Sequence, residues 1–162
     1  MADKRPETSG LAQGGIRIDF ADTSDLGAMA DLLGELFSLE SDFTPQREKQ
    51  LAALSWLLDH PDHGRLFVLR EGEALAGMAN ALISISTAEG GPVLVLEDVI
   101  VAASHRGQGL GRRLVEYVLA WAHEAGLSRV TLLADRDNAA ALRFYQALGF
   151  EESAMVVRRK RL

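Results

Sequence analysis

Residues 106–113 form a short segment rich in glycine and arginine, which reads Arg-Gly-Gln-Gly-Leu-Gly-Arg-Arg. Glycines let backbone N–H groups converge on a ligand, and a helix that begins here adds a field that favours anions. Arginines in the first turn of a helix oppose its dipole, so Arg112 and Arg113 are better explained by bound phosphates. The segment therefore predicts a phosphate-binding loop, with a plain glycine-rich turn as the alternative.

Two well-known phosphate loops do not fit this segment. A Walker A loop ends in Gly-Lys-Ser or Gly-Lys-Thr, whereas Gly111 is followed by two arginines. A dinucleotide fingerprint needs its third glycine at position 112, which is arginine here. These two nucleotide-binding patterns are therefore excluded.

The elements that position the loop follow from hydrophobic periodicity and turn residues. Strands are predicted over residues 16–20, 66–70, 74–87, 93–101, 130–134 and 150–159. Helices are predicted over residues 24–37, 45–58, 109–125 and 138–149, the last of them capped by Asp137 or Asn138. The order β-α-α-β-β-β-α-β-α-β predicts an α/β (α+β) fold, in which helices cover a mixed sheet.

The strand before the loop carries two adjacent acids, Glu97 and Asp98, in an otherwise apolar sequence. A strand that is apolar on both faces is expected at the centre of a sheet. Buried carboxylates are costly unless they are paired or functional. Because adjacent strand residues point to opposite faces, we expect only one of the two to project into a given pocket.

These features together resemble the GCN5-related N-acetyltransferase (GNAT) superfamily. Its pyrophosphate loop reads Arg or Gln, two residues, Gly, one residue, and Gly or Ala, which Arg106, Gly109 and Gly111 match. Residues 97–101 resemble the family's fourth strand, and residues 138–150 resemble its later signature Asn…Phe-Tyr…Gly-Phe. The order of strands and helices also matches from residue 16 onward. The two motifs together are far more specific than either alone.

The resemblance implies a GNAT fold, with a mixed, mostly antiparallel sheet of six or seven strands flanked by four helices. A single domain is expected over residues 15–162, after a polar, disordered tail at residues 1–14. The implied cosubstrate is acetyl-CoA, and no metal is expected. The residues expected to contact the coenzyme are Val99, Ile100, Val101, Arg106, Gly107, Gln108, Gly109, Leu110, Gly111, Arg112, Asn138 and Tyr145.

Asn138 and Tyr145 are seven residues apart, nearly two helical turns, so they share one face of the last predicted helix. If that face meets the coenzyme, Asn138 can bind the pantetheine arm and Tyr145 can reach the sulfur. A tyrosine hydroxyl, with a pKa near 10, can protonate a thiolate whose thiol has a pKa of about 8.5. Tyr145 is therefore the predicted general acid, and a half-buried aromatic with a satisfied hydroxyl is the alternative.

Glu97 is the predicted general base, acting directly or through water. An alkyl amine has a pKa of about 10.4 and is mostly protonated at neutral pH, so a group must accept its proton. Glu97 and Asp98 also resemble the Glu-Asp pair of glucosamine-phosphate N-acetyltransferases. The alternatives are that both acids pair with arginines, or that a water network replaces the base.

The acceptor is expected to be the primary amine of a small molecule, attacked directly in a ternary complex. Glu40, Asp42, Phe43 and Asn80 are candidates to orient a cationic amine, with solvated loop residues as the alternative. A protein N-terminus or a lysine is the second hypothesis, and a non-catalytic acyl-CoA-binding module is the third. The acceptor's identity and the acyl chain length stay open. Because dimers are common in the family, the possibility of a homodimer also stays open.

Composition narrows the remaining classes. The 162 residues carry a net charge of −6, which argues against general nucleic-acid binding. The absence of cysteine excludes disulfides and fits a cytoplasmic protein, and no apolar run or leader indicates a membrane. The four histidines, His60, His63, His105 and His123, lack metal-ligand spacing. The basic C-terminal residues 158–161 are predicted to be a solvated edge strand.

Overall fold

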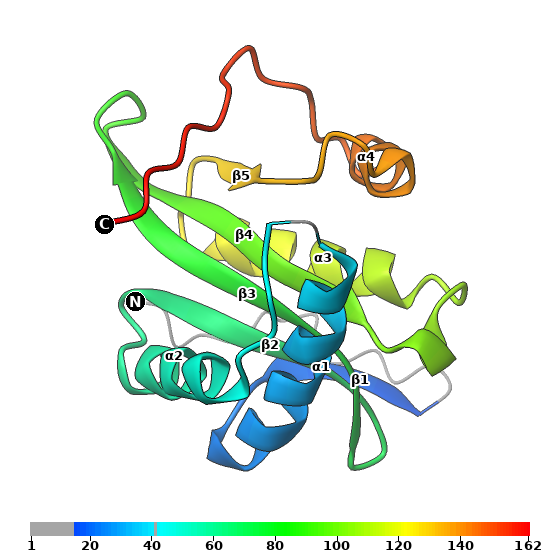
Figure 1. Ribbon diagram of the computed structural model, residues 1–162. Coiled ribbons are helices and arrows are strands. Elements are labelled where there is room, and N and C mark those ends of the chain that lie inside the picture. Colours follow the sequence, from blue (N-terminus) through cyan, green and yellow to red (C-terminus); the bar gives the residue numbers. More distant parts are fainter. Residues whose placement is uncertain (1–14, 41) are drawn as a thin grey trace.

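The computed structural model describes residues 15–40 and 42–162, so the predicted tail at residues 1–14 lies outside the described residues. One sheet runs in the order β1-β2-β3-β4-β5 and helices cover both of its faces (Figure 1). The strands are β1 Ile16–Phe20, β2 Gly64–Glu71, β3 Ala74–Ser86, β4 Gly91–Val101 and β5 Val130–Leu132. The helices are α1 Leu26–Leu39, α2 Arg47–Asp59, α3 Leu110–Glu124 and α4 Ala139–Gln146, with short 3₁₀ turns at Thr23–Asp25 and Ala103–His105.

The sheet is mixed and mostly antiparallel, which confirms the predicted fold class. Strands β1 to β4 pair antiparallel, and only the β4–β5 pair is parallel. A parallel pair needs a crossover connection, and α3 supplies it. The chain therefore passes through the glycine loop as it leaves β4 for that crossover.

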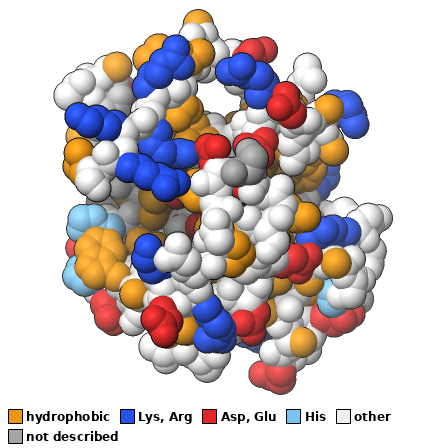
Figure 2. All heavy atoms as spheres, viewed as in Figure 1, with side chains coloured by type: hydrophobic (Ala, Val, Ile, Leu, Met, Phe, Trp, Pro, Cys, Tyr) orange, Lys and Arg blue, Asp and Glu red, His pale blue; other side chains and the backbone are white. Residues whose placement is uncertain are grey.

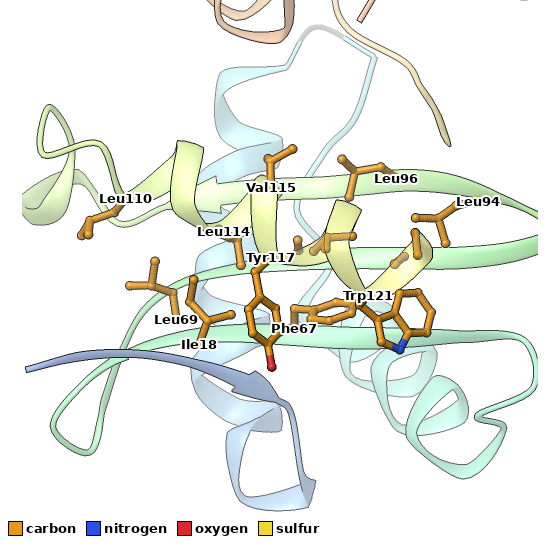
Figure 3. Close-up of a cluster of buried hydrophobic side chains, with 14 of the residues drawn as sticks. Ile18, Phe67, Leu69, Leu94, Leu96, Leu110, Leu114, Val115, Tyr117 and Trp121 are labelled. Atoms are coloured by element: carbon orange, nitrogen blue, oxygen red, sulfur yellow. The ribbon is translucent and has the colours of Figure 1, made fainter. Parts of the chain in front are cut away.

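The larger core lies between the sheet and α3. Tyr117 and Trp121 of α3 point toward Phe67 on β2 (Figure 3), with ring centroids 6.0 and 5.3 Å from that of Phe67. Leu114 and Val118 of the same helix are fully buried. Apolar residues at this three- and four-residue spacing form one stripe of α3, and this stripe fixes the helix against the sheet.

The second core lies between the opposite face of the sheet and α1 with α2. Met29 and Leu33 of α1 meet Met78 of β3 there. A buried ion pair adds to it: both Arg70 Nη atoms on β2 donate to the Asp25 carboxylate, each at 2.7 Å. A bidentate, buried pair of this kind holds the start of α1 in register with the sheet.

The predicted closing strand at residues 150–159 is wrong, because no strand follows β5 among the described residues. The sheet therefore has five strands among the described residues, and not the predicted six or seven. Strand β5 has only three residues, so its outer edge offers few ladder hydrogen bonds. Met155 and Val156 stay exposed, and Figure 2 shows an opening beside the C-terminal segment with basic and acidic side chains on its border.

Within the part of the chain that is described, no helix is both long and apolar enough to cross a membrane.

Candidate functional site

The glycine loop joins the end of β4 to the first turn of α3. Gly107 and Gly109 adopt left-handed backbone conformations, with φ of 75° and 73°. A Cβ at either position would meet no atom within 4 Å, so these glycines are required by backbone conformation rather than by crowding. Gly111 differs, since its Cβ would lie 3.6 Å from the Phe144 ring of α4. An added Cβ would make only ordinary van der Waals contact there, so the packing of α4 does not require a glycine at position 111.

The start of α3 is suited to an anion. Its N-cap residue is Gly109, which has no side chain to accept hydrogen bonds from the first-turn N–H groups. The helix is 15 residues long, so its dipole adds to the attraction. Binding of a pyrophosphate at this place stays a prediction. Ile100 and Leu110 are buried in the two cores, so only their backbone groups are available to a coenzyme.

Two of the loop's arginines have partners within the protein. Arg106 donates from Nε to the Val101 carbonyl at 2.8 Å and pairs with Glu35 of α1. Arg112 pairs with Glu116 at 2.9 Å and donates to the Ala147 carbonyl at 3.1 Å. Both guanidinium groups brace the loop against neighbouring helices, a structural reason for them that the sequence did not reveal. Their contact with phosphates stays a prediction.

A β-bulge interrupts β4 at the two adjacent acids. Asn80 of β3 pairs with Glu97 and Met78 pairs with Ile100, so two residues of β4 oppose one of β3. Asp98 in the bulge has φ of 52°, the only positive φ of a non-glycine residue among those described. A backbone outlier of this kind points to function.

The prediction that Glu97 and Asp98 point to opposite faces of the sheet is wrong, and the bulge is the reason. Leu96 and Val99 both pack on the α3 side of the sheet, so the two acids between them cannot point to strictly opposite faces. Asp98 lines a pocket on the α1–α2 side, and its charge acts on Glu97. Both carboxylates therefore belong to one site, because the extra residue cancels the two-residue period of the strand.

The pocket beside the bulge has a volume of about 170 Å³. Asn80 and Asp98 form its polar end, and the Asn80 amide donates to the Asp98 carboxylate at 3.2 Å. Asn80 is only 6% exposed and its Oδ1 atom has no hydrogen-bond partner. A buried polar atom without a partner is expected to receive one from a ligand or water.

Acidic side chains gather at this end of the molecule, and the pKa values of Glu40, Glu97 and Asp98 are raised. Burial is the main cause of the raised pKa of Glu97, and the charge of Asp98 adds to it. Burial also raises the pKa of Asp98, against the hydrogen bond from Asn80. The pKa of Glu40, which follows α1, is raised by burial and by nearby carboxylates. These carboxylates are Asp135, Asp98, Asp42 and Glu97.

Tyr145 lies on α4 next to these acids. Its ring packs edge-on against Phe144 and Phe150, with centroid distances of 5.0 and 5.7 Å. Burial raises the pKa of Tyr145, and the charge of Glu40 adds to the rise. The hydroxyl thus keeps its proton at neutral pH. Figure 1 shows the end of α1 pointing toward α4.

Asn138 is the N-cap of α4, and it is one of the two residues, Asp137 and Asn138, that the sequence predicted for this place. Its side-chain oxygen accepts a hydrogen bond from the Ala141 N–H at 3.0 Å. The cap fixes the start of the helix that carries Tyr145. Contact between Asn138 and a pantetheine arm stays a prediction.

Sequence reasoning missed Arg159. This residue was assigned to a solvated edge strand, yet its guanidinium binds Asp42 at 2.8 Å and lies 5.2 Å from the centre of the Phe43 ring. Its charge also lowers the pKa of Glu97. Arg159 and Asp42 are 117 residues apart, and no local pattern could connect them.

Among the described residues, no group of histidines or acids is arranged to hold a metal ion.

Comparison with known proteins places these features in context. The model of the Acetyltransferase (GNAT) family matches residues 28–150. N-acetyltransferase family 8 member 2 of Rattus norvegicus is 32% identical over 91 residues, which cover 56% of this chain and 40% of that protein. Aminoglycoside N(6')-acetyltransferase type 1 of Salmonella typhimurium is 30% identical over 99 residues, covering 59% of this chain and 68% of that protein.

A solved structure gives the same result. AAC(6')-Iy in complex with a bisubstrate analogue of CoA and acetylneamine superposes with a TM-score of 0.75 at 25% identity, over 91% of this chain and 99% of that one. The chain spans only about two fifths of the length of some of the curated relatives that it matches.

Proposed function

Because the chain belongs to the acetyltransferase (GNAT) family, we propose that it transfers an acetyl group from acetyl-CoA to the primary amine of a small molecule. The observation that carries the proposal is the bulge in β4. The bulge carries Glu97 and Asp98 on the same strand that leads into the glycine loop, and the charges of Asp98 and Glu97 act on Glu40, whose charge acts on Tyr145. A single strand thereby links a donor site to an acceptor site.

The coenzyme is proposed to follow β4. Pairing between β4 and β5 ends at Leu96 and Leu132, so residues 97–101 of β4 have only β3 as a neighbouring strand among the described elements. An extended ligand with amide groups can add hydrogen bonds along such an edge. The backbone of Val99 and Val101 would pair with the pantetheine arm, and the first turn of α3 would hold the pyrophosphate.

Two side chains are proposed to move protons. The bound thioester supplies an activated acetyl group. Glu97, directly or through water, accepts a proton from the ammonium group of the acceptor, and the neutral nitrogen forms the new C–N bond as the C–S bond breaks. Tyr145 donates its phenolic proton to the leaving sulfur, and the second proton that the nitrogen loses as the amide forms restores the Tyr145 hydroxyl, directly or through water. The raised pKa of each group suits its role, since Glu97 binds a proton more readily and Tyr145 arrives protonated.

The direct test is thiol release from acetyl-CoA with a panel of small amines. We expect thiol release that depends on the amine and an acetylated product of matching mass. If the protein binds the coenzyme measurably but no amine gives thiol release, the proposal is wrong.

The second candidate is a protein N-terminal or lysine acetyltransferase. Arg159 favours it, because a basic side chain on an extended segment of the chain lies against Asp42 and Phe43. Mass spectrometry of cell proteins with and without the enzyme distinguishes the two. Loss of acetylation at defined N-termini or lysines would support this candidate over a small-molecule acceptor.

A further inference from the structure

The acidic side chains near the bulge form a charged site that one ammonium group would not neutralise. The carboxylate cluster is defined as Glu40, Asp42, Glu97, Asp98 and Asp135. Arg159 supplies a positive charge at its outer side, where it binds Asp42. The inner side, formed by Asp98 and Asn80, faces a pocket. Burial makes Glu40, Glu97 and Asp98 costly as ions, and a bound cation would offset that cost.

Asn80 gives independent evidence for a ligand with N–H groups. Its amide nitrogen donates to Asp98, which orients the side chain and leaves Oδ1 as the free acceptor. This oxygen is buried, and Asn80 lines the pocket together with Asp98. Two adjacent acceptors, one of them charged, match the several N–H donors of an ammonium group.

The rest of the pocket suits a short alkyl chain. Its apolar wall comes from α1 and α2 and consists of Leu33, Phe37, Ala53, Leu54 and Leu57. The volume of about 170 Å³ is far above the roughly 10–15 Å³ that one water requires. Lys49 and Gln50 complete the lining, so a ligand that ends in a carboxylate is the competing chemistry.

We propose that the acceptor is a small diamine whose second ammonium group binds between Asn80 Oδ1 and Asp98 while its first is acetylated near Glu97 and Tyr145. The inference rests on the proposed acetyltransferase function and names its substrate class. A diamine is favoured over an amino acid because the inner end of the pocket presents two acceptors, whereas the side chain of Lys49 is exposed. The bulge thus contributes to both ends of the acceptor's site, with Asp98 at the second ammonium group and Glu97 near the amine that is acetylated.

Three acceptors of equal chain length test the proposal: 1,4-diaminobutane, 4-aminobutyrate and butylamine. We expect kcat/KM for the diamine to exceed that for butylamine by roughly tenfold or more, as for a hydrogen bond to a charged group. 4-Aminobutyrate should be the poorest acceptor. Equal values for the diamine and butylamine, or a preference for 4-aminobutyrate, would overturn the proposal and leave the acetyltransferase function intact.

Asp98→Asn is the informative variant, because asparagine has the same shape and tolerates a positive φ. The ratio of kcat/KM for the diamine over butylamine should fall toward one. Asp31→Asn is the matched control, since Asp31 is an exposed carboxylate of α1 that pairs with Arg47 away from the pocket. Its ratio should stay at the wild-type value. A thermal melt and coenzyme titration confirm that Asp98→Asn folds.

A binding measurement distinguishes failure of the diamine site from failure of the proposed acetyltransferase activity. Calorimetric titration of 1,4-diaminobutane into the CoA-bound protein should show binding that weakens about tenfold or more in Asp98→Asn. If the diamine binds in this way but no amine releases thiol, the proposed activity fails and the diamine site stands. If the diamine does not bind, or binds Asp98→Asn equally well, the diamine site is wrong.

Discussion

The glycine loop follows the end of β4, the carboxylate cluster includes the acids of the β4 bulge, and the two are built in opposite ways. The loop is one continuous segment, residues 106–113, and its suitability for phosphate comes from backbone conformation and the start of α3. The cluster is assembled from three separate parts of the chain, around residues 40–42, 97–98 and 135, and its character comes from side-chain charge. The donor site thus depends on local geometry, and the acceptor site depends on tertiary contacts.

Charge distinguishes the same two regions. Basic residues surround the loop, whereas carboxylates with raised pKa values surround the acceptor pocket. The net charge of −6 does not reveal this separation. Substitutions in the loop should therefore affect coenzyme binding, and substitutions in the cluster should affect catalysis and acceptor choice.

The largest effect is expected from Gly109→Glu. A side chain at φ of 73° strains the backbone, and its carboxylate would repel phosphate at the start of α3. Coenzyme binding should fall by roughly a hundredfold or more, as measured by calorimetry. Gly90→Glu is the matched control, since Gly90 has φ of 72° in the β3–β4 turn. Wild-type affinity in Gly109→Glu would refute the assignment of the loop.

Tyr145→Phe should come next. Loss of the general acid should lower kcat by about a hundredfold or more, while calorimetry should show unchanged coenzyme affinity. Tyr117→Phe provides a matched control, because Tyr117 packs in the α3 core against Phe67. Wild-type kcat in Tyr145→Phe would exclude the acid role without affecting the loop.

Glu97→Gln should change the pH dependence. A general base acts only when deprotonated, so kcat/KM should fall as the pH drops through the pKa of Glu97, which is raised above the ordinary value of 4.5. In Glu97→Gln this acid limb should disappear and the rate should fall by about tenfold or more. An unchanged acid limb would assign the base to a water network instead.

The smallest effect is expected from Arg159→Gln. Arg159 lowers the pKa of Glu97, so its removal should move the acid limb of the kcat/KM profile to higher pH. The shift should be small, because the side chains of Arg159 and Asp42 are 48% and 61% exposed and water screens their charges. Arg158→Gln is the control one residue earlier. A limb that moves equally in both variants would contradict a specific role for Arg159.

Much of the donor side was predictable from the sequence. Gly107, Gly109 and Gly111 lie within one turn, and their conformation depends on neighbours along the chain. The order of strands and helices as far as α4 agrees with the prediction for the same reason, and Asn138 is one of the two caps that the sequence predicts. The structure added partners for Arg106 and Arg112, which a local pattern does not specify.

The acceptor side was decided by tertiary structure. Alternation along β4 predicted that Glu97 and Asp98 face apart, and only the register of β3 against β4 places a bulge there. The predicted strand at residues 150–159 did not form beside the short β5, and Arg159 instead reached Asp42 across 117 residues. The sequence by itself determined the position of the glycine loop and the family, because these depend on neighbouring residues. The acceptor pocket depends on strand register and long-range packing, which only the folded chain brings together.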